Sequence, residues 1–231
     1  MLVGGTVGQF RALKVAQWAA IRMAGDGTSQ EIFGEAAAED AIPSGIRRRM
    51  GQLERLVVRC TLGVLTGEPT AELIFCSRYG NVETLSSLLR SIAEKQLMSP
   101  MAFSGSVHNA APGLVGQIRK ERLSHTALAA GARTFAAGLI EGYARLVSDG
   151  CHDVTLTFAD LLLPELYRDF EEETVPGLAM AIRLELAGEN DDASPITVQP
   201  GRRGVLEVLE HLNNGPVYLS LEEPLWMTPA L

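Results

Sequence analysis

The sequence has 231 residues, of which 46% are hydrophobic and 21% are charged, so it can bury the core of one large domain. Its formal charge is -8 and its one dense basic run is Arg47-Arg48-Arg49, which argues against nucleic acid as a partner. No apolar run reaches the roughly 18 to 20 residues that span a bilayer, and the first residues lack a signal-peptide pattern, so a cytoplasmic location is expected.

Three cysteines, Cys60, Cys76 and Cys151, are widely spaced and lie in apolar or strand-like contexts. An odd number at such spacing is typical of reduced thiols rather than of a disulfide framework. No pair of cysteines or histidines has the spacing of zinc ligands, and the acidic runs at 171–173 and 191–192 do not have calcium-loop spacing. We therefore expect no metal site.

The first forty residues give a weak structural signal. Residues 1–24 have apolar positions that fit either a helix or a buried strand, and the pattern does not decide between them. Residues 25–43 mix Gly, Asp, Ser and Ala without a sustained period, which predicts a surface loop with at most one short helical turn.

A stronger pattern begins at Ser44. Apolar residues recur at three- and four-residue steps from Ile46 to Leu65, which predicts one amphipathic helix capped by Ser44. A turn at 67–69 then leads to a short buried strand over 71–77.

Two helical stretches follow this strand. Leu85, Leu88, Leu89, Ile92 and Leu97 share one face of a helix over 82–97. The pattern over 104–120 predicts a second helix. This helix is expected to kink at Pro112-Gly113, because proline removes a backbone hydrogen bond.

The rest of the chain alternates strands and helices. Strands are predicted over 124–130, 152–160, 177–188 and 216–221, and helices over 132–150 and 205–212, with a short amphipathic segment at 163–170 and an acidic loop at 189–195. This alternation predicts an α/β fold with a mixed sheet.

Several short motifs have a familiar order. Ser99-Pro100, the segment Asn109-Ala110-Ala111-Pro112-Gly113, and an apolar strand that leads into Ala136-Ala137-Gly138 resemble the ketosynthases of the thiolase superfamily. Within that superfamily the chain is most similar to the ketosynthase-like chain length factors of aryl polyene and related lipid pathways. Further matching segments are 47–50, 76–80, 106–109 and 159–167.

The resemblance implies a thiolase-like layered α/β/α fold, about one half of the duplicated ketosynthase fold. It implies a single ketosynthase-like domain over 1–231, with a core at about 46–187 and a C-terminal extension at 188–231.

Two departures from the family bear on chemistry. In an active ketosynthase a cysteine lies between the strand and the following helix, where the helix N-terminus lowers its pKa and it forms a thioester. The matching position here is Ala130, and neither Ala129 nor Gly131 supplies a nucleophile. The segment after Leu186 is also too short to be the second half of the fold, so the resemblance implies that the paired catalytic histidines are absent and that no catalytic residue is present.

By resemblance, the chain is a non-catalytic chain length factor that forms a heterodimer with an active ketosynthase and shapes the acyl or polyene tunnel. It uses no cofactor, meets an acyl carrier protein only indirectly, and can form a homodimer when alone. The strand at 124–130 and the segment 107–114 would form the apolar dimer surface. Five residues would line the tunnel or interface: Phe103, Val107, His108, Asn109 and Phe135.

Two alternatives stay open on the sequence alone. One is a stand-alone acyl-thioester enzyme, for which Cys76, Ser104 and Ser106 are the available nucleophiles. The segment around His108 lacks the G-x-S-x-G elbow of a serine hydrolase, and Cys76 has no nearby His or Lys in the sequence to generate a thiolate. The other alternative is a homodimeric acyl-binding scaffold.

Overall fold

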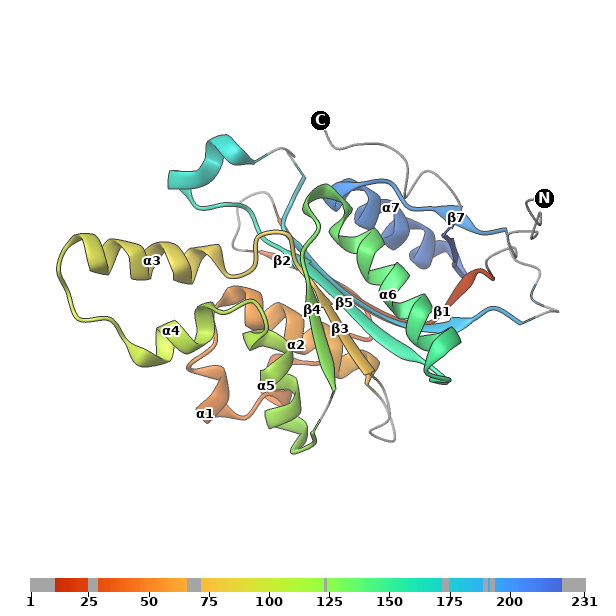
Figure 1. Ribbon diagram of the computed structural model, residues 1–231, viewed down its shortest axis with the longest axis horizontal. Helices are drawn as coiled ribbons and strands as arrows, with labels where there is room; N and C mark the ends of the chain where they lie inside the picture. Colours follow the sequence, from red (N-terminus) through yellow and green to blue (C-terminus); the bar gives the residue numbers. More distant parts are fainter. Residues whose placement is uncertain are drawn as a thin grey trace, which may run out of the picture.

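One long strand in the interior of the sheet has partners along both of its edges in the computed structural model, which describes residues 11–24, 29–65, 72–122, 124–171, 175–188, 191 and 194–221 (Figure 1). This strand, β1 (Leu13–Met23), pairs antiparallel with β6 (Leu178–Leu186) along one edge. Its other edge pairs with β8 (Tyr218–Ser220) near its start and with β2 (Gln30–Gly34) near its end. The open question about residues 1–24 is thus settled as a strand for the described part.

The other half of the sheet contains the strands predicted from short apolar runs. β3 (Glu72–Cys76) pairs in parallel with β4 (His125–Leu128) and with β5 (Val154–Asp160), and β5 pairs antiparallel with β6. The strand order is β4-β3-β5-β6-β1-β8-β7, where β7 (Ile196–Thr197) is a short strand that the sequence pattern did not predict. The mixed sheet is confirmed, and β4 forms its edge.

Helices cover both faces of this sheet (Figure 1). α6 (Thr134–Ser148) and α7 (Gly201–Asn214) pack on one face, where Cys76 and Leu156 belong to their core. α2 (Gln52–Val64) packs on the other face over Phe75 and Ala181, with α5 (Ala110–Arg119) beside it. Successive residues of a strand therefore pack into the cores on opposite faces of the sheet, because side chains alternate between the two faces of a strand. The result is an α/β/α layering, and β1, α7 and β8 contribute buried residues to its hydrophobic core.

The prediction of a single helix from Ser44 to Leu65 was wrong, because this segment forms two helices, α1 (Ser44–Arg47) and α2. Between them the chain turns to bury Met50. The Arg55 guanidinium donates to the carbonyl oxygens of Arg47 at 3.3 Å and Met50 at 3.2 Å, which satisfies backbone acceptors that a continuous helix would have paired. The loop predicted over 25–43 also contains β2, whose mostly exposed residues gave no apolar alternation, and the short 3-10 helix η1 (Glu39–Ala41).

The predicted kink at Pro112 was also wrong. The break lies at 107–109, between α4 (Pro100–Ser106) and α5, and Pro112 lies in the first turn of α5. Proline is tolerated there because the first N–H groups of a helix have no intrahelical acceptor. α3 (Val82–Ala93) forms as predicted but ends earlier, and η3 (Glu165–Phe170) forms the short segment after β5. The predicted turn at 67–69 lies outside the described residues.

Candidate functional site

The turn between β4 and α6 presents residue 130 to solvent. Ala129, Ala130 and Gly131 are all exposed, and Gly131 opens the 3-10 turn η2 (Gly131–Arg133) with a φ of 58°. The Ala130 N–H donates to Thr134 Oγ1 at 2.9 Å, and this hydroxyl donates to the Gly131 carbonyl at 2.7 Å. The turn is therefore held firmly at the start of α6, where the helix dipole favours a negative charge, but alanine offers no group to ionise.

A buried carboxylate lies beside this turn, at the end of β5. Asp160 accepts a hydrogen bond from Ser77 Oγ at 2.8 Å and from the backbone N–H groups of Arg78 and Tyr79, each at 3.1 Å. Ser77 Oγ in turn accepts from the Gly80 N–H at 2.7 Å. Burial raises the pKa of Asp160, although these hydrogen bonds act in the opposite direction. Asp160 thus ties the loop after β3 to the end of β5.

An arginine from α7 makes a similar connection on the other side. Arg202 is buried, lies 2.7 Å from the Glu171 carboxylate, and donates to the carbonyl oxygens of Leu161 and Val175, each at 3.2 Å. Glu171 also accepts from the Leu163 N–H at 3.0 Å. The loop after β5 is therefore fixed by a buried ion pair.

Sequence reasoning did not assign a role to Asp160, Glu171 or Arg202. One signal was available, because an acid at the end of a mostly apolar segment such as 154–160, predicted as a buried strand, needs buried hydrogen-bond donors. The partner Arg202 gave no such signal, since it lies far along the chain in a helix of ordinary amphipathic pattern.

Four of the five predicted tunnel or interface residues belong to one segment, α4 and the break that follows it. The side chains of Phe103 and Val107 are 60% and 44% exposed. His108 is half-buried, with Nε2 2.8 Å from the Ser77 carbonyl oxygen, and Asn109 precedes α5 without a capping hydrogen bond from its side chain.

Phe135 lies apart from these four residues. Its ring is buried under α6 and meets Phe158 edge to face, with ring centroids 5.8 Å apart. The His108 ring instead packs 5.4 Å from Phe75, which faces the α2 side of the sheet. His108 and Phe135 therefore lie on opposite faces of the sheet.

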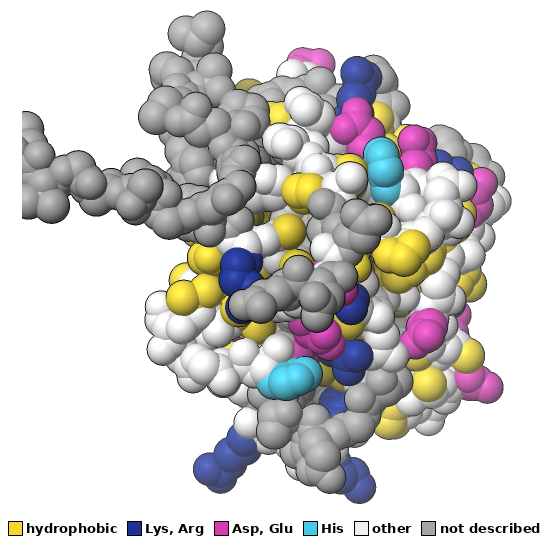
Figure 2. Space-filling view, turned by 90° about the vertical axis from the view of Figure 1, so that its right-hand side faces the viewer, with side chains coloured by type: hydrophobic (Ala, Val, Ile, Leu, Met, Phe, Trp, Pro, Cys, Tyr) yellow, Lys and Arg dark blue, Asp and Glu magenta, His cyan; other side chains and the backbone are white. Residues whose placement is uncertain are grey.

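α3 and α4 extend away from the sheet (Figure 1). Together with the segment between them and Val107, they carry most of the large exposed hydrophobic side chains of the described residues. We call residues 82–107 the apolar arm. On the side shown in Figure 2, which faces away from these helices, hydrophobic side chains are interspersed with charged and polar ones. Patches of exposed hydrophobic residues mark interaction sites more often than chance placement does. The exposed residues of the arm are Leu85, Leu89, Ile92, Leu97, Met98, Met101, Phe103 and Val107.

None of the nucleophiles considered for a stand-alone enzyme is paired with a base. Ser104 and Ser106 donate to the backbone oxygens of Pro100 and Phe103, at 3.0 Å and 2.8 Å. His108 Nε2 contacts the Ser77 carbonyl rather than either hydroxyl. Burial raises the pKa of Cys76, and the nearby Asp160 carboxylate raises it further, so this thiol stays protonated.

Within the described ranges, no three His, Cys, Asp or Glu side chains lie close enough together to hold a metal ion. None of the described helices is long and apolar enough to cross a membrane.

Comparison with known proteins identifies one matching family model, the N-terminal domain of β-ketoacyl synthases, over residues 16–206. No curated protein matches the chain by sequence. Among solved structures, a ketosynthase in complex with its chain length factor from Xenorhabdus doucetiae is 24% identical, with a TM-score of 0.64, over 80% of this chain and 85% of that one.

Two further structures are more distant in sequence. The ishigamide ketosynthase/chain length factor is 11% identical, with a TM-score of 0.60, and the match covers 78% of this chain and 63% of that one. A β-ketoacyl synthase from Burkholderia phymatum is 10% identical, with a TM-score of 0.53, and the match covers 77% of this chain and 59% of that one.

Proposed function

Because the chain belongs to the β-ketoacyl synthase N-terminal domain family, we propose that it is a non-catalytic subunit that pairs with an active ketosynthase. Its mixed sheet and helical layers are those of the thiolase-like ketosynthase fold, and it carries about half of the duplicated fold. In this proposal condensation takes place on the partner, and this chain shapes the space that receives the growing acyl or polyene chain.

The alanine at position 130 is the observation that carries the proposal. The turn from β4 into α6 exposes this residue at the start of a 15-residue helix, the position at which a thiol would be most easily ionised. Cys76, on the strand β3 that pairs with β4, is fully buried, and burial raises the pKa of its thiol so that it stays protonated. A fold with this geometry and no nucleophile at the turn suits a supporting role better than a catalytic one.

Two surfaces support pairing. β4 lies at one edge of the sheet and, among the described strands, pairs only with β3, so its outer backbone groups can continue the sheet into another chain. The apolar arm presents large hydrophobic side chains that a second ketosynthase fold would bury. A ketosynthase and its chain length factor form such a pair in one of the similar structures.

The arm also suggests how product length is set. Phe103 and Val107 lie exposed on it and would face the partner, so their size would decide where the chain stops. His108 and Asn109 would fix the segment that carries them, and Phe135 would support the turn at residue 130 from beneath. We place the reaction in cytoplasmic fatty-acid or aryl polyene type biosynthesis, with the acyl carrier protein docking on the partner.

The test is to express the chain together with a ketosynthase from the same gene neighbourhood and to measure product length by mass spectrometry. Val107→Trp is expected to shorten the product by at least one two-carbon unit. Val147→Trp, at a similarly exposed position on α6, is the matched control and is expected to leave product length unchanged. Turnover of an acyl thioester by this chain alone would contradict the proposal.

The homodimeric scaffold remains the second candidate, because the same apolar arm fits a second copy of this chain. Sedimentation of an equimolar mixture with the ketosynthase separates the two. If a heterodimer forms and any homodimer disappears, the result supports the subunit role. If the homodimer persists and does not bind the ketosynthase, the result supports the scaffold.

A further inference from the structure

A polar pocket of about 310 Å³ lies between β2, η1 and the start of α2. Six of the described residues line it, and all but one of them are polar: Gln30, Glu39, Met50, Gln52, Arg55 and Arg59. In the sheet, β3, β5, β6 and β1 lie between β2 and β4. The pocket is therefore remote from the turn at residue 130, which follows β4.

Arg59 is a buried cation in the wall of this pocket. The residue is 7% exposed, and its Nε donates to the Ala37 carbonyl and its Nη1 to Gln30 Oε1, each at 2.9 Å. Both acceptors are uncharged. No carboxylate of the described residues forms an ion pair with Arg59, and none of their atoms accepts from its Nη2. Buried charges in proteins are normally paired, so the charge of Arg59 lacks a counterion where it borders the pocket.

Arg55 supplies a second guanidinium group, and its counterion is exchangeable. Nη1 of Arg55 lies 3.2 Å from the Glu39 carboxylate, while the carbonyl oxygens of Arg47 and Met50 hold the other nitrogens. The side chains of Arg55 and Glu39 are 40% and 50% exposed. Exposed ion pairs contribute little to stability, so a competing anion can displace Glu39 from Arg55 at low cost.

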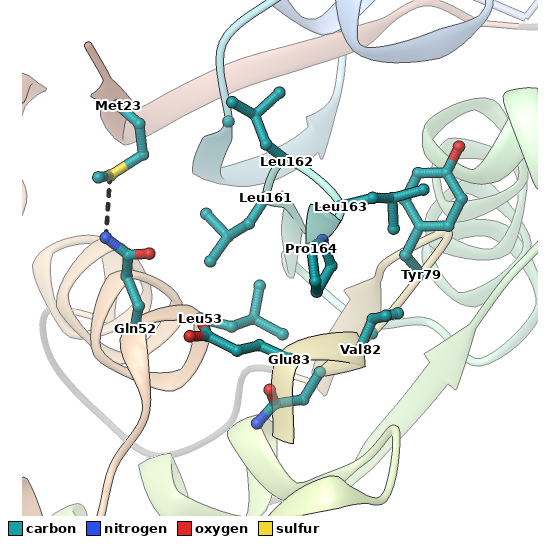
Figure 3. Close-up of a pocket in the computed structure, with 13 residues that line it drawn as sticks. Met23, Gln52, Leu53, Tyr79, Val82, Glu83, Leu161, Leu162, Leu163 and Pro164 are labelled. Atoms are coloured by element: carbon teal, nitrogen blue, oxygen red, sulfur yellow. Dashed lines mark hydrogen bonds between the residues drawn. The ribbon is translucent and has the colours of Figure 1, made fainter. Parts of the chain in front are cut away.

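A neighbouring pocket has the opposite character (Figure 3). Gln52 lines both pockets and points toward Met23, with its side-chain nitrogen 3.8 Å from Sδ. Leucines line much of this neighbouring pocket, and no lysine or arginine is among the described residues that line it. Of the two pockets, the polar one is therefore suited to an anion, because its arginines can donate charge-assisted hydrogen bonds.

We propose that the polar pocket binds a small, polar phosphate monoester, whose doubly charged phosphate is held by Arg59 and Arg55 in place of Glu39. Guanidinium groups bind phosphate oxygens in pairs through their planar N–H groups. Release of Glu39 leaves two positive charges in the wall, which match a phosphate dianion. The pocket is about twice as large as the roughly 150 Å³ cavity that holds benzene, so it has room for a polar group beside the phosphate. The site goes beyond the proposed function, because it requires no partner, no carrier protein and no growing chain.

The test titrates glycerol 3-phosphate into the isolated full chain, with binding followed by protein-observed NMR at pH 8. At this pH the monoester is doubly charged, because its second pKa is about 6. The methyl diester of glycerol 3-phosphate has a single charge and is expected to bind at least about fivefold more weakly. Inorganic phosphate is expected to bind at least about threefold more weakly, because it leaves part of the pocket unfilled.

A first pair of variants tests the buried charge. Arg59→Met removes this charge but keeps a side chain of similar length, and it is expected to weaken glycerol 3-phosphate binding by at least about tenfold. Arg49→Gln is the matched control, since it removes an exposed arginine that does not line the pocket. It is expected to change binding by less than about twofold, because exposed charges are screened by salt.

A second pair tests the exchange of Glu39. Glu39→Gln removes the competing carboxylate and is expected to strengthen glycerol 3-phosphate binding by at least about threefold. Because Glu39 is exposed, this variant is expected to fold. Glu141→Gln is the matched control, since it also removes one negative charge and an ion pair with an arginine, but on α6 and thus on the opposite face of the sheet from α2. It is expected to leave binding unchanged.

Equal binding of the monoester and the diester would overturn the proposal, as would inorganic phosphate that binds as tightly as glycerol 3-phosphate. Equal effects of the two members of either variant pair would also overturn it. If Arg59→Met does not fold, the comparison of Glu39→Gln with Glu141→Gln decides the outcome. Because no ketosynthase is present, a negative result leaves the pairing role untouched, and loss of pairing leaves this result untouched.

Discussion

Asp160 shows how one buried side chain can organise the site. It accepts hydrogen bonds from one hydroxyl and two backbone N–H groups, all from the loop after β3. Burial nevertheless raises its pKa, which means that desolvation of the carboxylate outweighs these bonds and the nearby Arg202. Ionised Asp160 therefore positions the loop at the expense of global stability.

This pKa shift has a definite sign in the pH dependence of folding. The folded state holds the Asp160 proton more tightly than the unfolded state. Protonated Asp160 therefore contributes stability that is fully present below pH 3.8 and is lost as pH rises through the higher pKa of the folded state. Asp160→Asn removes this dependence. We expect the difference in unfolding free energy between the original chain and Asp160→Asn to shrink with rising pH, by about 1.4 kcal/mol for each unit of pKa shift.

Urea unfolding between pH 4 and pH 8 measures this difference. The buried Glu54, whose pKa burial also raises, is present in both proteins and cancels in the comparison. A difference that grew with pH would mean that hydrogen bonding dominates over desolvation at Asp160.

The three cysteines differ in burial, and their reactivity is expected to differ accordingly. Cys60 and Cys76 are fully buried, and burial raises the pKa of Cys60 to about 12. Only Cys151 is partly accessible. Ellman's reagent is therefore expected to titrate one thiol in the folded chain and three after denaturation, and Cys151→Ser is expected to abolish the folded-state reaction. Rapid labelling of Cys76 would instead revive the stand-alone enzyme hypothesis.

At the scale of elements, α6 approaches the sheet more closely than a side chain at Gly138 would permit. A Cβ at this position would overlap Cys76 Sγ and lie 2.8 Å from Leu156 Cδ1. Gly138→Ala is expected to lower the unfolding free energy by about 1–3 kcal/mol, because β3 and β5 would have to shift.

Gly113→Ala on α5 is the matched control for this substitution. A Cβ there meets nothing within 4 Å, so it is expected to raise stability by about 0.5–1 kcal/mol through helix propensity alone. Chemical denaturation of both variants provides the comparison, and equal effects would show that α6 does not pack as described.

The elements differ in how well their sequences predicted them. β3 was marked by a short apolar run, β5 by a segment rich in β-branched and apolar residues, and β6 by its alternation and length. The breaks at 48–51 and 107–109 were not predicted. The first contains Gly51, a local signal that the helical period of the surrounding apolar residues obscured, and Arg55 stabilises it by donating to the carbonyl oxygens of Arg47 and Met50. The second places His108 against Ser77, a contact that is distant in sequence.

Of the whole molecule's surfaces, the apolar arm is the one on which the pairing proposal depends most. Leu89 and Ile92 are exposed on α3, so the double variant Leu89→Glu/Ile92→Glu is expected to change monomer stability by no more than about 0.5 kcal/mol. It is nevertheless expected to abolish co-purification with the ketosynthase. Leu166→Glu, which is also exposed but outside the arm, is the control.

The candidate site was predictable only in part for a similar reason. The motifs around Asn109 and Ala136 indicated the family and directed attention to Ala130, because they are local in sequence. The separation of Phe135 from His108 by the sheet, and the meeting of Asp160 with Arg202, depend on strand order and on the packing of α7. No single stretch of sequence contains that information.

The strand pairing of β1 has a consequence for how the chain folds during synthesis. β1 is translated long before its main partner β6 and its edge partner β8. Leu13 pairs with Leu186 and with Leu219, so this part of the sheet cannot close until β6 and β8 have been translated.

Such long-range pairing slows folding, and it leaves the β6 edge of β1 without its partner until β6 has been translated. Chaperone capture of the nascent chain, and a yield that depends on translation rate, follow from this topology.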